Sequence, residues 1–586
     1  MNGTAPANTG RTPALTSLLL WLLFCGLSLW SLRANIGPMD FRDPDDAMRL
    51  AQVRDFLNGQ SWFDVTQHRV LPPHGGPMHW SRLVDLPIAA LIAIFTPLAG
   101  TAMAERIACI AVPLLLLGGL CVMLHRILQQ LIGRGMTSPL GVALLLTSLP
   151  IVIQYMPLRI DHHGWQILMG AVTLFGALHS DVRRGGFIAG LGAAFWLHVS
   201  SEGLPYAVMF GGLFGLRYLF DRSEWSRLQI YMVVLAAGSA LLLLGTHGWA
   251  ASLVTHCDAM SPPFLVPLIA AATVLVTGKQ VAGDATTPRR LLHLCCAAAP
   301  AGVAFLILGK SCLAGPFETL DPIVYRYWYL EVAEGRPLWE QGIVMEGVVI
   351  LPALLAILAS AWAWLSTVKA SDRTLWACML LLQLGALVVA ILVTRAMAIA
   401  YLYSIPANVW LLARLYTRVK ASPSAPRRVL ATLGLALLTP VGLAMLWTAV
   451  TPAEAQPPAP KGPGCTSGQA LTPLSALPAA TIFAPLDMGP AILVRGKHSV
   501  IGTAHHRNVE GIALVLRGFM SPPDKARDIV RSTGSTMLVF CGSLSEMRKT
   551  AKDAPRGLAN ALEHGQVPGW LQPVPSSGPV RIYRVR

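Results

Sequence analysis

Acidic residues gather at one point near the start of the chain, in a sequence with only 30 Asp and Glu among 586 residues. Within seven residues stand Asp40, Asp43, Asp45 and Asp46. A long apolar segment at about residues 14–32 precedes them, and a carboxylate at a membrane edge indicates function because its desolvation is costly. Clustered oxygens suit a hard divalent cation such as Mg²⁺ or Mn²⁺. In the alternative interpretation, these aspartates lie in a solvated loop and cap a helix starting near Ala47.

Three further positions carry charge at the ends of apolar segments. The motif Asp161-His162-His163 sets imidazole beside carboxylate, which suits Mn²⁺ or Zn²⁺ better than Mg²⁺, unless Asp161 only caps the next helix. Arg395 interrupts an apolar stretch, and its guanidinium suits bidentate contact with phosphate. The alternative for Arg395 is snorkelling to the interface. Glu202 either faces the same cavity or lies in a solvated turn.

Composition indicates a polytopic membrane protein. Hydrophobic residues make up 54% of the chain, charged residues 13%, and the mean hydropathy is +0.55. Much of the formal net charge of +15 lies in short loops between apolar segments. The positive-inside rule produces this distribution, so we interpret the charge as topology and expect no nucleic-acid partner. The first apolar segment is not followed by an evident cleavage site, and we expect it to be a retained anchor.

Fourteen apolar runs are long enough to consider as membrane segments. They lie near residues 14–32, 83–99, 103–125, 138–156, 164–180, 185–199, 203–220, 228–246, 262–278, 290–309, 342–366, 375–393, 397–416 and 428–449. Six short loops hold 17 Lys or Arg, whereas three others hold two, so the six are assigned to the cytoplasm. The run at 83–99 is short and contains two prolines, which favours an external interfacial or re-entrant helix. Thirteen spans result, and both acidic loops then face outward.

The motifs around the acidic cluster resemble those of a known family. The first external loop contains Asp43-Pro44-x-x-x-x-Arg49, Trp62-Phe63-Asp64, Pro73-His74-Gly75 and His79-Trp80-x-x-Leu83-x-Asp85. Together they resemble the catalytic subunit of oligosaccharyltransferase and its single-subunit archaeal and bacterial relatives, which are membrane glycosyltransferases of the GT-C class. The motif at 161–163 is similar to the family's second acidic motif, notably its archaeal form. The resemblance covers roughly residues 15–450.

The resemblance implies transfer of a sugar from a polyprenyl-phosphate-linked donor on the external face, with a divalent metal (Mg²⁺ or Mn²⁺) held by acidic residues of separate loops. The implied catalytic residues are Asp45, Asp43 and Asp46. The implied metal ligands are Asp43, Asp45, Asp161, His163 and Glu318, with Glu331 and Glu334 as rivals of Glu318. Arg395 is implied to bind the lipid phosphate. Further candidate substrate contacts are His162, Glu202, Arg49, His79, His505, His506 and Arg507. Whether Asp43 or Asp45 is the principal carboxylate stays open.

The fold class expected is a polytopic α-helical membrane protein with a small C-terminal α/β domain. Residues 1–450 form the transmembrane domain, 451–464 a proline-rich linker and 465–586 the periplasmic α/β domain. Strands are predicted at 481–485, 499–503, 537–540 and 580–585. Helices are predicted to begin near Val509 and Pro523, the second capped by Ser521. Cys465–Cys541 and Cys257–Cys312 are predicted disulfides, because all four cysteines fall on the oxidising side, whereas six other cysteines lie within apolar runs.

The acceptor is the least defined part of the prediction. The family's Trp-Trp-Asp-Tyr-Gly motif is missing from this sequence, which makes transfer to asparagine doubtful. We therefore expect an envelope glycan, lipid or protein acceptor at a bacterial inner membrane, with the amino terminus cytoplasmic and membrane lipids around the spans. The alternative function is a transporter or flippase of lipid-linked sugars, which should show internal repeats and charges inside spans.

Overall fold

The computed structural model describes residues 11–282, 284–315, 317, 320–452, 464–576 and 578–586. All fourteen apolar runs form helices. These are α1 (Arg11–Ser31), α4 (Arg82–Ala99), α5 (Thr101–Leu131), α6 (Thr137–Thr147) with α7 (Leu149–Val152), α8 (His163–Leu178), α9 (Val182–Val199), α10 (Leu204–Phe220), α11 (Trp225–Ser252), α12 (Pro262–Ala282), α13 (Thr287–Leu308), α15 (Ile343–Ser366), α16 (Ala370–Leu392), α17 (Met397–Lys420) and α18 (Ala425–Leu437) with α19 (Pro440–Val450). Shorter helices lie between them, namely α2 (Arg33–Ile36), α3 (Pro44–Leu57) and α14 (Pro322–Tyr327).

The helical part is that of a multi-pass membrane protein. Among the described residues, nine helices are long and apolar enough to cross a membrane. The pairs α6–α7 and α18–α19, bent by 71° and 82°, would bring the number to eleven. The thirteen spans therefore remain a prediction. Helix α4 is one of the nine by length and composition, so its assignment as an external helix also remains a prediction.

The C-terminal part is a small α/β domain around one five-stranded sheet. Its order is β2-β1-β3-β5-β4, with β1 (Thr481–Phe483), β2 (Ser499–Val500), β3 (Met537–Phe540), β4 (Leu571–Val574) and β5 (Arg581–Val585). Strands β2, β1 and β3 are parallel, and β3, β5 and β4 are antiparallel. The surrounding helices are α20 (Gly468–Ser475), α21 (Gly489–Arg495), α22 (Val509–Met520), α23 (Pro523–Ser532), α24 (Ser545–Asp553) and α25 (Leu558–Glu563).

Sequence-based expectations for this domain were mostly right. The four predicted strands are present, and α22 and α23 begin at the predicted residues. Strand β4 was missed because it is a short edge strand that contains Pro573, a residue that argues against a central strand. The predicted cap of α23 is wrong, because Ser521 ends α22 and Pro522 precedes α23 without a side-chain hydrogen bond.

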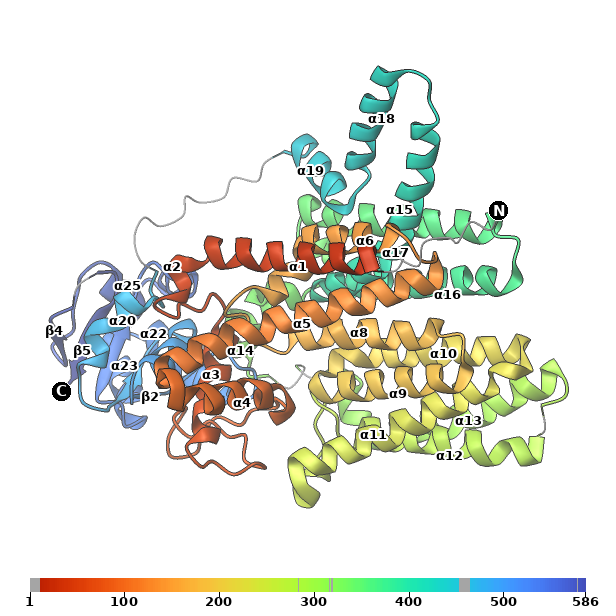
Figure 1. Cartoon of the computed structure of the whole chain (residues 1–586). Helices are drawn as coiled ribbons and strands as arrows, with labels where there is room; N and C mark the ends of the chain where they lie inside the picture. Colours follow the sequence, from red (N-terminus) through yellow and green to blue (C-terminus); the bar gives the residue numbers. More distant parts are fainter. Residues whose placement is uncertain (1–10, 283, 316, 318–319, 453–463, 577) are drawn as a thin grey trace.

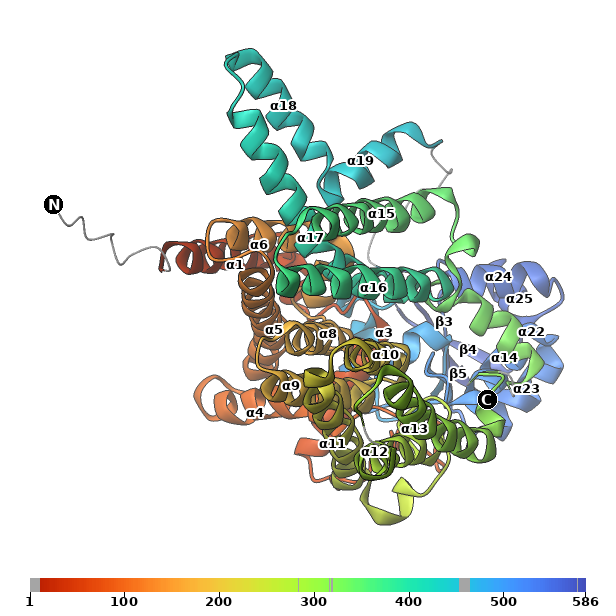
Figure 2. The same ribbon diagram turned by 90° about the vertical axis from the view of Figure 1, so that its right-hand side faces the viewer.

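The sheet domain docks on the loop between α3 and α4, which the sequence analysis predicts to be the first external loop. Leu71 N–H donates to the Val500 carbonyl at 2.8 Å, and Val70 pairs with Val500, so the loop covers the β2 edge of the sheet. Arg54 of α3 donates to the Val494 carbonyl and forms an ion pair with Glu105 at 2.6 Å. Figures 1 and 2 show the sheet domain (blue) beside α3 at one end of the helices.

Both predicted disulfides are present. Cys257–Cys312 joins the segment after α11 to the segment after α13, and Cys465–Cys541 closes the sheet domain, with Cα–Cα distances of 5.2 and 6.1 Å. The six other cysteines all lie in the long helices α1, α5, α13 and α16 and are free. There a cysteine behaves as a small apolar residue.

Candidate functional site

The acidic cluster lies at the amino-terminal end of α3. Asp43 is the N-cap, and its Oδ1 accepts a hydrogen bond from the Asp45 backbone N–H at 2.9 Å. Pro44 follows at the first helical position, where its fixed φ and missing N–H favour helix initiation. The cap interpretation is therefore correct for Asp43. It does not account for the two aspartates that follow.

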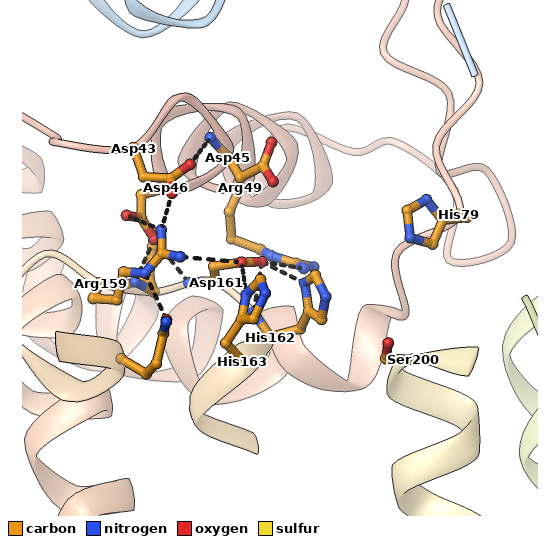
Figure 3. A network of polar contacts seen from close by, with 12 residues as sticks. Asp43, Asp45, Asp46, Arg49, His79, Arg159, Asp161, His162, His163 and Ser200 are labelled. Atoms are coloured by element: carbon orange, nitrogen blue, oxygen red, sulfur yellow. Dashed lines mark hydrogen bonds and ion pairs between the residues drawn. The ribbon is translucent and has the colours of Figure 1, made fainter. Parts of the chain in front are cut away.

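Asp46 ties this helix to the second acidic loop. Its Oδ1 accepts hydrogen bonds from the backbone N–H groups of Ile160 and Asp161, at 2.8 and 2.9 Å. Its Oδ2 lies 3.0 Å from Arg159, which also pairs with Asp43 at 2.6 Å and approaches Asp161 at 3.8 Å (Figure 3). The two acidic loops thus face the same side of the molecule, as the sequence predicts.

Asp161 is the buried centre of the second loop. Its Oδ1 lies 2.5 Å from His162 Nδ1, and its Oδ2 contacts His163 Nδ1. Burial alone raises the pKa of a carboxyl, but the two imidazoles outweigh it and hold the pKa of Asp161 well below its usual range. Asp161 is therefore an anion that fixes two histidine side chains.

Arg49 is a buried cation beside Asp161. Its guanidinium is fully buried, donates to Asp85 at 2.9 Å, lies 3.7 Å from Asp161 and stacks over the Trp80 ring at 4.3 Å. These contacts give Arg49 a positioning role. Its predicted contact with substrate stays a prediction, because the side chain is enclosed on all sides in this structure.

Asp45 differs from its neighbours in having an unengaged carboxylate. None of the described residues forms a hydrogen bond or ion pair with it, and it is only half-buried. Burial and the nearby charges of Asp161 and Asp43 raise the pKa of Asp45 well above its ordinary value. Burial also raises the pKa of Asp46, to about 7, although Arg159 opposes this rise. A perturbed, unpaired carboxyl beside a cluster of charged groups is typical of a functional residue.

The second loop could hold a metal ion. One ligand atom from each of Asp161, His162 and His163 falls within 4.8 Å of the others. His163 Nε2 is buried and has no hydrogen-bond partner among the described residues. Carboxylate and imidazole donors fit Mn²⁺ or Zn²⁺. The predicted ligand Glu318 lies outside the described residues.

Arg395 and Glu202 come together beside His163, as the sequence suggests. Arg395 pairs with Glu202 at 2.8 Å and with Glu334 at 3.5 Å. Arg395, Glu202 and His163 line one cavity between α8, α10, α16 and α17. Of the two rivals of Glu318, Glu334 lies at this site, whereas Glu331 pairs with Lys549 of the sheet domain.

The remaining predicted contacts form a separate group. His79, His505 and His506 lie together, and Arg507 pairs with Asp258 at 2.7 Å. The role of Arg159 was not predicted, although this residue stands two positions before Asp161 in the same short loop. Asp258 was not predicted either, because its partners lie about 250 positions away in the chain.

Comparison with known proteins rests on structure alone. No family model matches the sequence, and no curated protein matches it either. The fold is that of the GT-C glycosyltransferase AglB, the archaeal oligosaccharyltransferase of Archaeoglobus fulgidus. A structure of AglB with an inhibitory peptide and a dolichol-phosphate has a TM-score of 0.64 at 14% identity, over 95% of this chain and 72% of that chain. A structure of the Archaeoglobus fulgidus oligosaccharyltransferase tethered to an acceptor peptide with the NVT sequon has a TM-score of 0.62 at 14% identity, over 97% of this chain and 74% of that chain. Its complex with Zn and sulfate has a TM-score of 0.60 at 14% identity, over 94% of this chain and 71% of that chain.

Proposed function

We propose that the protein is a membrane glycosyltransferase that moves a sugar from a polyprenyl-phosphate-linked donor to an envelope acceptor. The observation that carries the proposal is the junction at Asp46, which binds the backbone of Ile160 and Asp161. This junction brings an unengaged carboxylate, Asp45, beside the group of Asp161, His162 and His163, called the Asp161 cluster below. The shared fold with AglB, a protein crystallised with a dolichol-phosphate, supports a lipid-linked donor.

Asp45 is the proposed base. The acceptor hydroxyl attacks the anomeric carbon of the sugar, its O–H proton passes to the Asp45 carboxylate, and the bond between sugar and phosphate breaks. This role requires a carboxylate that is free to take a proton and lies within hydrogen-bond reach. Asp43 and Asp46 are committed to Arg159 and to backbone N–H groups, so Asp45 is the better choice. Its raised pKa strengthens it as a proton acceptor.

Arg395 is the proposed phosphate contact. It lines a cavity with His163, and its Nε is buried without a hydrogen-bond partner among the described residues. Its present partners are Glu202 and the half-exposed Glu334, the latter at 3.5 Å. In the proposal the leaving phosphate takes the place of Glu334. A charge-assisted bidentate contact then holds the lipid phosphate as it departs.

Asp161 and His163 are the proposed metal ligands, with His162 as a third donor nearby. AglB has been crystallised with Zn, and imidazole with carboxylate suits Zn²⁺ or Mn²⁺, with Mg²⁺ less well matched. When bound, a divalent ion supplies positive charge that stabilises the phosphate leaving group. Arg49 and Arg159 keep Asp161 in place for this task.

The proposed location is a bacterial inner membrane, with the amino terminus in the cytoplasm and the sheet domain in the periplasm. The excess of Lys and Arg in the loops at the opposite end of the helices supports this orientation. So do two disulfides at the end that carries the acidic loops. The proposed acceptor is an envelope glycan, lipid or protein, because the sequence lacks the family's Trp-Trp-Asp-Tyr-Gly motif.

A deletion strain tests the function. It is complemented with the wild-type gene, with Asp45→Asn, or with Asp524→Asn as a control at an exposed position of α23. Polyprenyl-phosphate-linked sugars are then measured by mass spectrometry in spheroplasts, before and after treatment with impermeant periodate. We expect donor to accumulate in the deletion and Asp45→Asn strains, and to be oxidised because it is exposed on the outer face.

Two outcomes would contradict the proposal. Accumulated donor that is protected from periodate would indicate a flippase, which is needed before the sugar reaches the outer face. Equal donor levels in all four strains would show that the protein does not consume a lipid-linked sugar.

A further inference from the structure

Three histidines from distant parts of the chain meet where the sheet domain touches the membrane part. His79 belongs to the first external loop, whereas His505 and His506 follow β2 in the sheet domain. One ligand nitrogen from each lies within 4.8 Å of the others. His79 Nδ1 and His505 Nε2 are 3.0 Å apart. Two nitrogens on one tetrahedral Zn²⁺ with bonds of about 2.0–2.1 Å are separated by about 3.3 Å, so a small adjustment would admit the ion.

We propose that His79, His505 and His506 form a second metal site that takes Zn²⁺ and fastens the sheet domain to the first external loop. This site is separate from the Asp161 cluster. Trp80 adjoins both, with its ring centroid 6.4 Å from that of His162 and 5.4 Å from that of His505. The proposal does not depend on the glycosyltransferase function.

Burial supports a ligand at this position. His505 is only 6% exposed, and among the described residues its Nε2 contacts only His79 Nδ1, at 3.0 Å. Two imidazole nitrogens at this distance must share a proton or a cation, because two lone pairs repel each other. The three rings are also close together, with centroid distances of 4.8–5.1 Å. Such convergence of three imidazoles suits Zn²⁺ and does not suit Mg²⁺.

Asp258 completes the arrangement as a positioning residue. Its Oδ2 lies 2.6 Å from His506 Nε2, and its two oxygens accept from Arg507 at 2.7 and 2.8 Å. If His506 donates its Nε2–H to this carboxylate, its Nδ1 carries the lone pair that a metal needs. A carboxylate behind a histidine is the usual support of a zinc ligand. Asp258 is itself anchored, because Cys257 forms the disulfide with Cys312.

The metal content of the full-length protein tests the proposal. The protein is purified without a histidine tag, stripped with a chelator, reloaded with Zn²⁺ and freed of excess ion. Zinc per chain is then measured for the wild type, His505→Ala/His506→Ala, His79→Asn and the control His564→Ala, an exposed histidine of the same domain. We expect both site variants to bind one zinc fewer than the wild type and the control to bind the same amount. Asp258→Asn should weaken the affinity about 10–100-fold.

A second measurement leaves the proposed site intact. In Asp161→Asn/His163→Asn protein the other cluster is disabled, and X-ray absorption at the zinc edge reports only the second site. We expect about three imidazole nitrogens at about 2.0–2.1 Å. No bound zinc in this protein, or equal zinc in the wild type and His505→Ala/His506→Ala, would overturn the proposal. Gel filtration of every variant excludes loss of zinc through unfolding.

Discussion

The Asp161 cluster and the His79–His505–His506 cluster both adjoin Trp80, but the carboxylates beside them differ in their surroundings. In the first, burial and nearby anions raise the pKa of Asp45 well above its usual value, and its carboxylate stays unengaged. In the second, burial acts against Asp258, but hydrogen bonds from His506 and Arg507 outweigh it and lower the pKa. The Asp45 carboxylate therefore has no partner to give up before it could react, whereas the Asp258 carboxylate is held by hydrogen bonds.

The clusters also differ in how the chain assembles them. Asp46 and Arg159 join two loops that each supply a short run of functional residues, at 43–46 and 159–163. The second cluster combines single residues from segments more than 400 positions apart, such as His79 and His505. If the comparison is correct, damage to the first cluster should abolish transfer, and damage to the second should alter metal content and domain attachment.

Asp45→Asn should have the largest effect. Removing a general base costs typically 10²–10⁴-fold in rate, and the amide cannot accept the proton. We expect transfer to fall at least 100-fold in membranes that contain wild-type amounts of protein, with zinc at the second cluster unchanged. Asp524→Asn serves as the matched control, because the same change is made at an exposed residue. Transfer within twofold of wild type would remove Asp45 from the mechanism.

Arg159→Gln should have the next largest effect. Arg159 is 13% exposed and bridges Asp43, Asp46 and Asp161. Without it, partly buried carboxylates lose their counter-charge, which costs about 3–5 kcal/mol when a buried pair is broken. We expect a lower melting temperature and transfer reduced by roughly 10–100-fold, with partial rescue by Arg159→Lys. Arg183→Gln, at an exposed position on α9, is the control. An unchanged melting temperature would show that the bridge is not structural.

The fold was largely predictable because its signals are local. Runs of apolar residues define each membrane helix, and all fourteen are helical in the structure. The number of spans was less predictable, because bends such as that between α6 and α7 break a run without changing its hydropathy. In the sheet domain, alternating apolar residues indicated the central strands, but β4 contains Pro573 and lies at the edge.

The candidate site was predictable where its residues are neighbours in sequence. Asp43, Asp45 and Asp46 stand together, as do the residues at 161–163, so both groups were recognisable. Their division of roles was not, because it depends on Arg159, which pairs with Asp43 and Asp46 but leaves Asp45 free. The proposed zinc site was not predicted. No cysteine stands at zinc-finger spacing from His505 and His506, which argues against a metal from sequence alone, and His79 lies more than 400 positions away.

Arg395→Gln should act mainly on donor binding. If the guanidinium holds the leaving phosphate, its loss removes charge-assisted hydrogen bonds worth about 1.5–3 kcal/mol. We expect the KM for the lipid-linked donor to rise roughly 10–100-fold, measured with purified protein in liposomes. Arg336→Gln is the control, since Arg336 pairs with Glu340 in the neighbouring segment. A fall in kcat at unchanged KM would instead assign Arg395 to the transition state.

The smallest effect is expected from Cys257→Ser/Cys312→Ser, and it separates the clusters most cleanly. The disulfide holds the segment that carries Asp258, while the Asp161 cluster is fixed by Asp46 and Arg159 without it. Removing the cross-link releases chain entropy in the unfolded state and frees Asp258 to move, which loosens the support of His506. We therefore expect transfer within about twofold of wild type, because Asp45 keeps its surroundings. Zinc affinity of the second cluster should fall by up to about 10-fold, measured by chelator competition.

Cys465→Ser/Cys541→Ser is the matched control, because that disulfide closes the sheet domain and does not adjoin Asp258. Its loss should lower the free energy of unfolding of the domain by about 2–4 kcal/mol, seen as a lower melting temperature. Zinc affinity should be unchanged. If the first pair of substitutions instead abolished transfer, the two clusters would be coupled through the segment at Asp258, and they would not act as separate sites.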